Sequence, residues 1–226
     1  MKFKKIVLLL VLCFAAAQAG AEILSITPPT DGVGVNPWAQ DWRWPLTPNT
    51  GYHWGDERIY VKFDLSPIAA LAAQAVQNGQ TLQINSVTFG AFGATVTSAG
   101  HPFNDALYAV DNTAWTNATI PNNWYDAGFL ALGSNLGSWS FLEWDWNLMS
   151  SDALKERVVA IAGSTNKQAA FCIAASILGD YANDMHTYYF NGTNMKLDVD
   201  YTIPEPTTMA LMGFGLVGLL RRFKHA

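Results

Sequence analysis

The fold is decided first by residues 58–65, which read RIYVKFDL. Every second side chain in this stretch, from Ile59 to Leu65, is large and apolar, and Tyr60, Lys62 and Asp64 stand between them. Side chains alternate between the two faces of a β-strand, so this two-residue period predicts a half-buried strand.

The same period returns at residues 197–201, where Leu197, Val199 and Tyr201 alternate with aspartates. Six further short apolar runs are separated by Gly, Asn and Pro, which favour turns. These additional candidate strands are 82–92, 106–110, 128–132, 158–162, 169–177 and 187–190. Many short strands with turn residues between them predict an all-β fold, a jelly-roll β-sandwich.

One short helix is expected to be inserted between two strands. Ser66 is placed as its N-cap, Pro67 as its first helical residue and Gly79 as the residue just past its end. A second helical turn is expected over 151–157, with Ser150 or Ser151 as the cap.

The N-terminus has the composition of a secretory signal peptide. Residues 1–21 begin with three lysines, continue through an apolar stretch from 6 to 17 and end in small residues. Cleavage after Ala19 and cleavage after Ala21 fit equally well. We therefore expect residues 1–21 to be removed, and Cys13 with them.

The central part of the chain is acidic. Between residues 22 and 204, acidic residues outnumber Lys and Arg by 17 to 7. Nucleic acid is excluded as a partner, because phosphate binding needs a cationic face. Cys172 is the cysteine that remains after the leader is removed, and its apolar surroundings favour a buried core residue over a reactive thiol.

The C-terminus combines three features in a fixed order. Pro204-Glu205-Pro206 is followed by uncharged residues from 207 to 220 and then by Arg221 and Arg222. This order resembles the PEP-CTERM sorting signal, which is also catalogued as the ice-binding protein C-terminal domain, a label that does not by itself imply ice binding. The expected organisation is a signal peptide over 1–21, one domain over 22–202 and a sorting signal over 203–226.

The apolar part of this tail is short for a permanent anchor. As a helix, 14 residues span about 21 Å, against about 30 Å for the hydrocarbon core of a bilayer. The basic end is expected to stay in the cytoplasm, with the preceding domain across the inner membrane. The resemblance implies an exosortase as processing partner, and a protein that is transiently membrane-anchored and then released to the cell surface or extracellular matrix.

A second resemblance covers residues 36–201. The stretch from 58 to 66, the segment 110–116, the Trp-Asp-Trp segment at 144–146 and the closing stretch 197–201 resemble the DNRLRE family of jelly-roll modules, which are similar to carbohydrate-binding modules. The DNRLRE string itself is absent, and the expected helix occupies what is usually a short turn.

Tryptophan is the most suggestive residue type for ligand binding. The chain has 9 tryptophans, and Trp38, Trp42 and Trp44 lie close together. In an extended strand, Trp42 and Trp44 would share one face about 6.7 Å apart, as a platform on which sugar rings stack. Burial in the core is the alternative and the stronger expectation for this group, and more strongly so for Trp115, Trp139 and Trp144, which lie in apolar segments.

Metal binding and catalysis have weaker signals. Asp180, Asn183 and Asp184 offer oxygen ligands for calcium, although capping of a loop by these side chains is the stronger interpretation. The four histidines form no H-E-x-x-H pattern, and the chain has no G-x-S-x-G motif. No catalytic residue and no further cofactor are predicted.

The sequence therefore favours a non-catalytic exported surface or matrix protein that associates with exopolysaccharide. One alternative is a purely structural surface protein with protein partners. A polysaccharide-active enzyme is a further alternative, because acidic pairs such as Glu143 with Asp145 and Asp198 with Asp200 could serve a glycosidase at the right separation.

Overall fold

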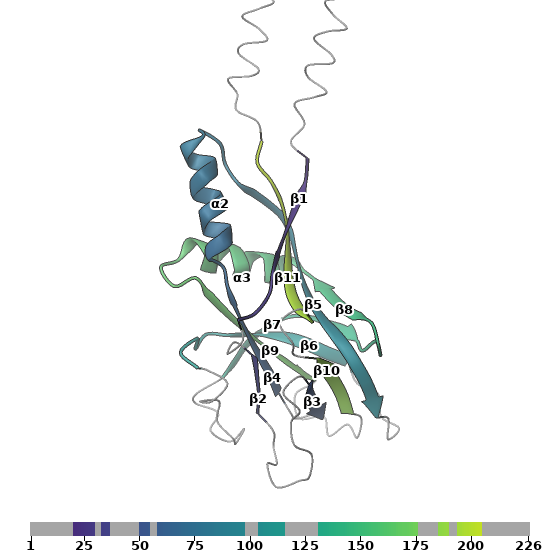
Figure 1. Cartoon of the computed structure of the whole chain (residues 1–226). Helices are drawn as coiled ribbons and strands as arrows, with labels where there is room; N and C mark the ends of the chain where they lie inside the picture. Colours follow the sequence, from purple (N-terminus) through teal and green to yellow (C-terminus); the bar gives the residue numbers. More distant parts are fainter. Residues whose placement is uncertain are drawn as a thin grey trace, which may run out of the picture.

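The computed structural model describes residues 20–29, 33–36, 50–54, 58–97, 104–115, 131–175, 185–189 and 194–204. Within these ranges the chain forms eleven strands and two helices, and the strands make two antiparallel sheets (Figure 1). The predicted all-β sandwich is confirmed.

The first sheet has the order β1-β11-β5-β10-β3, with β8 also paired to β5. Its strands are β1 (Glu22–Ile26), β3 (Thr50–Trp54), β5 (Gln83–Thr97), β8 (Trp146–Ser150), β10 (Met185–Tyr189) and β11 (Met195–Thr202). The long strand β5 pairs with β11 over its first part and with β10 beyond that.

The second sheet has the order β2-β4-β9-β6-β7. Its strands are β2 (Val33–Asn36), β4 (Arg58–Asp64), β6 (Asn104–Val110), β7 (Leu132–Ser140) and β9 (Gln168–Ala175). Strand β4 is the stretch on which the prediction rested, and β11 is the predicted closing strand.

Four antiparallel pairs join the first half of the chain to the second: β1 with β11, β4 with β9, β5 with β8, and β6 with β7. These pairs follow one another along a single long hairpin, and successive pairs lie alternately in the first and the second sheet. A hairpin rolled up in this way is the jelly roll.

The core lies between the two sheets. Ile59, Val61 and Phe63 of β4 are fully buried and meet the inward-facing residues of β5 and β11. The ring centroid of Phe63 lies 6.3 Å from that of Phe89 and 6.1 Å from that of Phe171, so aromatic contacts cross the sandwich.

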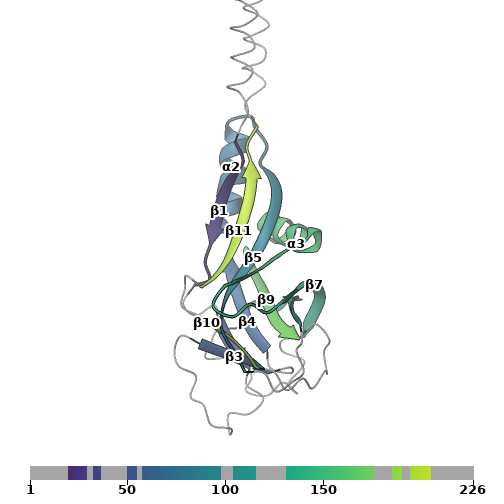
Figure 2. The same cartoon turned by 90° about the vertical axis from the view of Figure 1, so that its right-hand side faces the viewer.

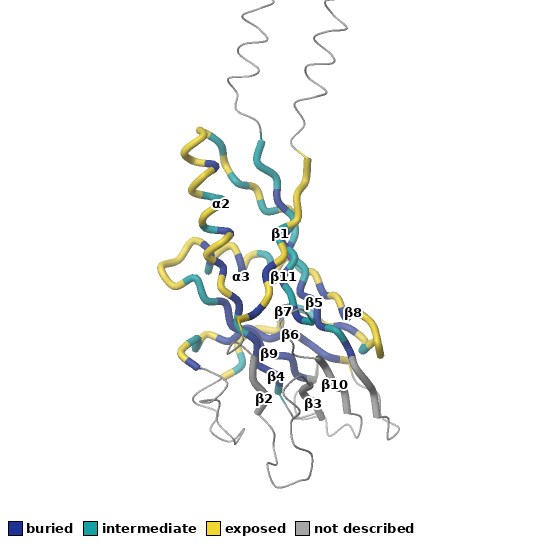
Figure 3. The backbone as a smooth tube through the Cα atoms, viewed as in Figure 1, coloured by how far each residue is buried: buried dark blue, intermediate teal, exposed yellow. Residues whose placement is uncertain are grey.

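The outer face of β4 is also covered, and the expectation of a half-buried strand is corrected here. Tyr60 is buried against Trp115, with ring centroids 6.1 Å apart and an edge-to-face geometry. The Lys62 ammonium donates to the Thr113 and Trp115 carbonyls at 3.2 and 2.6 Å. Figure 3 shows the consequence, which is that β4, β6 and β9 are buried over much of their length.

Helix α2 (Ser66–Gln77) is the predicted insertion between β4 and β5. Ser66 is not its N-cap, because Leu65 occupies that position and the side-chain acceptor comes from Asp64. The Asp64 carboxylate accepts from the Ser66 amide at 2.9 Å and from the Ser66 hydroxyl at 2.6 Å. Gly79 ends the helix as expected, in the left-handed region at φ +68°.

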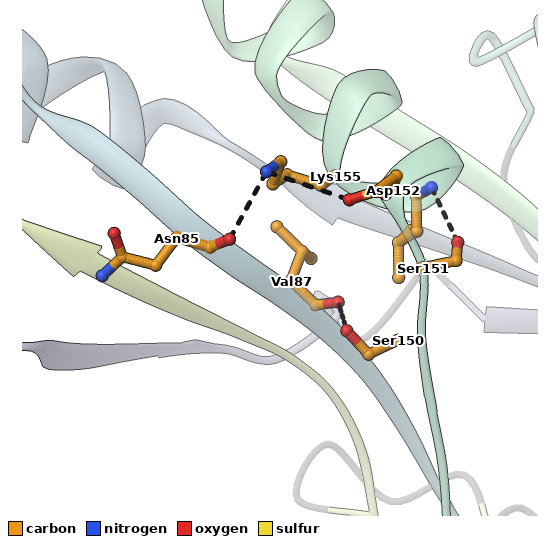
Figure 4. A network of polar contacts seen from close by, with 7 residues as sticks. Asn85, Val87, Ser150, Ser151, Asp152 and Lys155 are labelled. Atoms are coloured by element: carbon orange, nitrogen blue, oxygen red, sulfur yellow. Dashed lines mark hydrogen bonds and ion pairs between the residues drawn. The ribbon is translucent and has the colours of Figure 1, made fainter.

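Helix α3 (Asp152–Gly163) corrects two predictions. The predicted strand 158–162 lies inside it, and the sandwich therefore has two inserted helices among the described residues instead of one. The Ser151 hydroxyl caps the helix by accepting from the Leu154 amide at 3.0 Å, and Lys155 links it to β5 through the Asn85 carbonyl (Figure 4). Its buried residues Leu154, Val158 and Ala162 recur every fourth position, which is a helical period.

Both views of the ribbon show one end of the sandwich formed by the start of β1, the end of β11 and the end of α2 (Figure 1, Figure 2). Glu22 pairs with Tyr201 in the ladder between β1 and β11. The first and last described parts of the chain therefore lie side by side.

Candidate functional site

The end of β11 is fastened to the rest of the domain by side chains. We call this region the tail junction and define it as Glu22, Gln80, Asn85 and residues 201–204. The Tyr201 hydroxyl donates to the Glu22 carboxylate at 2.6 Å, and this hydrogen bond raises the pKa of Tyr201. The bond ties the beginning of β1 to the end of β11.

Gln80 holds the last described residue of the chain. Its side-chain amide donates to the Pro204 carbonyl at 2.8 Å. Gly79 and Gln80 form a Schellman motif at the end of α2, in which their amides donate to the Val76 and Ala75 carbonyls at 2.9 and 2.8 Å. The motif fixes the backbone of Gln80, so that its side chain can reach the tail.

Asn85 supports the same strand end. Its side-chain amide donates to Asp200 at 3.0 Å and to the Thr202 hydroxyl at 2.8 Å. Residues 200–204 are therefore tied to β5 and α2 by side chains in addition to the backbone ladder. Of the predicted sorting residues, Pro204 lies at this junction, and Glu205, Pro206, Arg221 and Arg222 lie outside the described residues.

A second candidate site lies on the outward face of the first sheet. We call it the tryptophan face and define it as Phe92, Trp146, Leu148, Lys196 and Asp198. Phe92 is opposite Trp146 in the ladder between β5 and β8, with ring centroids 5.8 Å apart. The Lys196 ammonium lies 4.8 Å from the centre of the Trp146 ring and 2.7 Å from the Asp198 carboxylate.

Gly90 forms the floor of the tryptophan face. A Cβ at this position would lie 3.1 Å from the Leu148 side chain, 3.2 Å from the Trp146 ring and 3.3 Å from Lys196. Glycine on β5 thus lets side chains of β8 and β11 approach the strand closely. Beside them, Ser25 donates to Asp198 at 2.6 Å, so the apolar surface continues into hydroxyl and carboxylate groups.

Trp144 projects from the turn that joins β7 to β8. It is 59% exposed, which corrects its expected place in the core, while Trp115 and Trp139 are buried as predicted. Its φ of 55° places a non-glycine residue in the left-handed region. Such a conformation persists only where the surrounding structure imposes it.

Asn147 imposes that conformation. Its buried side chain accepts from the Leu142 amide at 2.6 Å and donates to the Leu142, Asp145 and Ala91 carbonyls at 3.1 to 3.3 Å. The Gly93 amide also donates to the Asp145 carbonyl at 2.9 Å. The turn is therefore fixed to β5, and Trp144 is presented from a rigid base.

The other predicted binding residues lie outside the described part of the chain. These are Trp38, Trp42 and Trp44 of the suggested glycan platform, and Asp180, Asn183 and Asp184 of the suggested calcium site. Within the described ranges, no group of three His, Cys, Asp or Glu side chains is arranged to hold a metal ion.

Cys172 is a buried core residue, as expected. It lies with Tyr60 and Trp115 in the cluster that covers the outer face of the second sheet. Burial raises the pKa of its thiol to about 12, so the thiolate form that reacts is scarce at neutral pH. The acidic residues Glu143 and Asp145 are exposed in the β7–β8 turn.

These features define a class of protein. It is a jelly-roll sandwich in which the first and last strands pair with each other, and the last strand is followed directly by a C-terminal tail. The comparison with protein families adds a particular finding, which is that residues 202–224 match the PEP-CTERM protein-sorting motif. This motif implies export, sorting to the cell surface and processing by an exosortase, and it suggests a secreted surface protein rather than an enzyme.

No curated protein matches the chain. In the part of the chain that the structure describes, no helix has the length and apolar character needed to cross a membrane.

Proposed function

We propose that the protein is a non-catalytic surface protein whose jelly-roll domain is delivered outside the cell and associates with exopolysaccharide. The observation that carries the proposal is the sorting motif at 202–224, which begins within the last strand of a folded domain. A signal peptide over 1–21 and a tail that anchors the precursor transiently in the membrane complete the proposed route.

The arrangement of the chain ends supports this route. Cleavage after Ala21 and cleavage in the segment from Pro204 to Pro206 would leave β1 and β11 intact, since these strands span Glu22–Ile26 and Met195–Thr202. Both peptides can thus be removed without cutting a strand. The mature protein would keep its full hydrogen-bonded ladder between β1 and β11.

The tryptophan face and Trp144 support the association with polysaccharide. Aromatic rings bind the apolar faces of sugars, and the hydroxyl and charged groups beside them can pair with sugar hydroxyls. The Lys196 ammonium is paired with the Asp198 carboxylate, and Glu143 and Asp145 are exposed in the turn that leads into Trp146. We therefore expect this surface to favour a neutral glycan over an acidic one. Trp38, Trp42 and Trp44 remain a second candidate platform, and calcium at Asp180, Asn183 and Asp184 remains a prediction.

The proposal is tested with the chain from 22 to 204 and insoluble polysaccharide from the producing cells. Trp144→Ala is expected to abolish retention without lowering the melting temperature, because the side chain is 59% exposed. Val159→Ala is the matched control, since Val159 is 44% exposed on α3, and it should bind like the wild type. If the wild-type protein is folded and is not retained, the association with glycans is wrong, and a structural protein with protein partners takes its place.

The same preparation tests the absence of catalysis. We expect no release of reducing sugar ends from the polysaccharide. Release that disappears in Glu143→Gln or Asp198→Asn would instead identify a polysaccharide-active enzyme.

A further inference from the structure

Helix α2 differs from an ordinary surface helix in having no charge. From Ser66 to Gln80 the chain contains no Asp, Glu, Lys, Arg or His. Of its residues only Ile68 and Ala75 are buried, and Figure 3 shows that much of the helix is exposed. The exposed side carries Ala70, Ala73 and Val76 beside the uncharged Gln74 and Gln77. An uncharged side of this kind can face either water or the headgroup region of a membrane without having to bury a charge.

The two most exposed large apolar side chains among the described residues belong to close sequence neighbours of the tail junction. Ile23 is 72% exposed and directly follows Glu22, which is bonded to Tyr201. Val76 is 70% exposed, and its carbonyl accepts from the Gly79 amide in the motif that positions Gln80. Both residues are thus within a few positions of the side chains that hold the end of β11 and Pro204.

The length of chain between the tail junction and the apolar part of the tail indicates how close the domain lies to the membrane. Pro204 is held by Gln80, and the uncharged stretch of the tail begins at Thr207, three residues later. Three residues span at most about 10 Å. The polar headgroup layer of a bilayer is itself about 5 to 8 Å thick on each side. A tail inserted in the membrane therefore brings the tail junction to the headgroup surface.

The N-terminus leads to the same surface. Glu22 lies five residues after the apolar stretch of the predicted signal peptide, which ends at Ala17. Basic residues lie at the outer end of both apolar segments, Lys2 to Lys5 in the leader and Arg221 with Arg222 in the tail. Both segments would run from the cytoplasm to the same end of the domain.

We propose that, while the tail is attached, the end of the sandwich formed by α2 and the tail junction rests on the lipid surface, with Ile23 and Val76 in contact with the bilayer. This inference rests on the proposed function, since it requires the tail to be inserted. Apolar side chains on such a surface bury themselves at the boundary between headgroups and acyl chains. Processing of the tail would then release this end into water.

The test uses the full chain in phosphatidylcholine vesicles, with Cys13→Ser removing the accessible thiol of the leader. An environment-sensitive fluorophore is attached in turn at Ile23→Cys, Val76→Cys and, as the control, Leu148→Cys. Leu148 is also an exposed apolar residue, but it lies on β8, away from the junction. The buried Cys172 should not be labelled.

Probes at 23 and 76 are expected to shift to shorter wavelength and to be quenched by nitroxide-labelled lipid, and the probe at 148 should do neither. If the protein floats with the vesicles but all three probes emit at the wavelength of a water-exposed probe and are not quenched, the inference is wrong and the anchored route stands. If the protein does not float with the vesicles, both the anchor and the inference fail. A blue shift without vesicles in the chain that ends at Pro204 would show that a second copy covers this end, which also overturns the inference.

Discussion

Asp64 ends strand β4 and begins helix α2. Its side chain accepts two hydrogen bonds from Ser66, and these bonds hold the pKa of the carboxyl below its usual value. A native state with a lowered carboxyl pKa binds fewer protons than the unfolded chain. Asp64 therefore stabilises the fold above the unfolded pKa and loses this effect as the pH falls through the folded pKa.

Replacement of this carboxylate is the first prediction. Asp64→Ala should lower the free energy of unfolding by about 1 kcal/mol at pH 7, the usual effect of losing a helix-capping side chain. The difference from the wild type should shrink below about pH 4, where the carboxylate becomes protonated in the unfolded chain. Denaturant titrations at pH 7 and pH 3 measure both effects.

Asp152→Ala provides the matched control, because Asp152 lies in the first turn of α3 and is exposed. Its loss should cost only about 0.3 to 0.5 kcal/mol, the value of a favourable charge near a helix N-terminus. An equal or larger effect at Asp152 would contradict the special role of Asp64.

The tryptophans show how far single residues can be assigned from sequence. Trp115 and Trp139 lie in apolar segments and are buried, as predicted. Trp144 was expected in the core as well, yet it is exposed, and its immediate neighbours in the turn are the exposed Glu143 and Asp145. That acidic flanking is the signal that sequence reasoning missed. The role of Asn147 could not be foreseen, because three of its four hydrogen bonds close a local turn whose shape depends on contact with β5.

At the scale of elements, strands with a strict two-residue period were predictable. Strands β4 and β11 follow the period and were found at the expected places, as were β5, β6, β9 and β10. The predicted strand 128–132 reaches only the first residue of β7, and residues 128–130 lie outside the described residues. The rest of β7 was missed because its buried residues, Leu136 and Trp139, are three positions apart. Register shifts in its pairing with β6 break the alternation there.

Helix α3 was predicted only in its first turns. The run from Val158 to Ala162 is rich in β-branched residues, which favour strands when judged locally. Its burial in the core at every fourth residue overrides that preference, and the cap at Ser151 starts the helix early enough to include it. Tertiary packing decided this element, and a short sequence window does not contain that information.

The end of α2 gives a prediction at the same scale. Gly79 has φ +68°, where a Cβ is unfavourable, although no atom lies within 4 Å of the position that a Cβ would take. Gly79→Ala should therefore destabilise the domain by about 1 kcal/mol through the backbone alone.

Gly163 is the internal control, because it ends α3, also has no atom within 4 Å and does not have a positive φ. Gly163→Ala should be neutral or stabilise by up to about 1 kcal/mol. Thermal unfolding of the two variants distinguishes the two glycines, and equal shifts would contradict the conformational requirement at Gly79.

At the scale of the whole molecule, the rolled hairpin explains why both ends of the domain meet. Strands β1 and β11 are the first and last strands of the hairpin and pair with each other. The chain before β1 and the chain after β11 therefore leave from one end of the sandwich. In the proposed route, both peptides would be removed from this one end, as expected of a protein that is held at a membrane and later released. In this proposal the tryptophan face, which lies on the outward side of the first sheet, is the surface that meets a partner outside the cell.

The tail was recognisable from sequence because its motif, apolar stretch and basic end are local and ordered. The pairing of Glu22 with Tyr201 was not, since these residues are 179 positions apart in the sequence. Likewise, the hydrogen bond between Gln80 and Pro204 joins residues that are 124 positions apart in the sequence. Long-range partners of this kind follow from the topology, which the strand pattern indicates only in outline.

The central claim is that the chain loses both ends and leaves the β-sandwich outside the cytoplasm. Mass spectrometry of the protein recovered from the surface of the producing cells tests it most directly. We expect a species that begins at Gly20 or Glu22 and ends between Pro204 and Pro206. Recovery of intact chains from Met1 to Ala226 in the soluble cytoplasmic fraction, with none at the surface, would contradict the account.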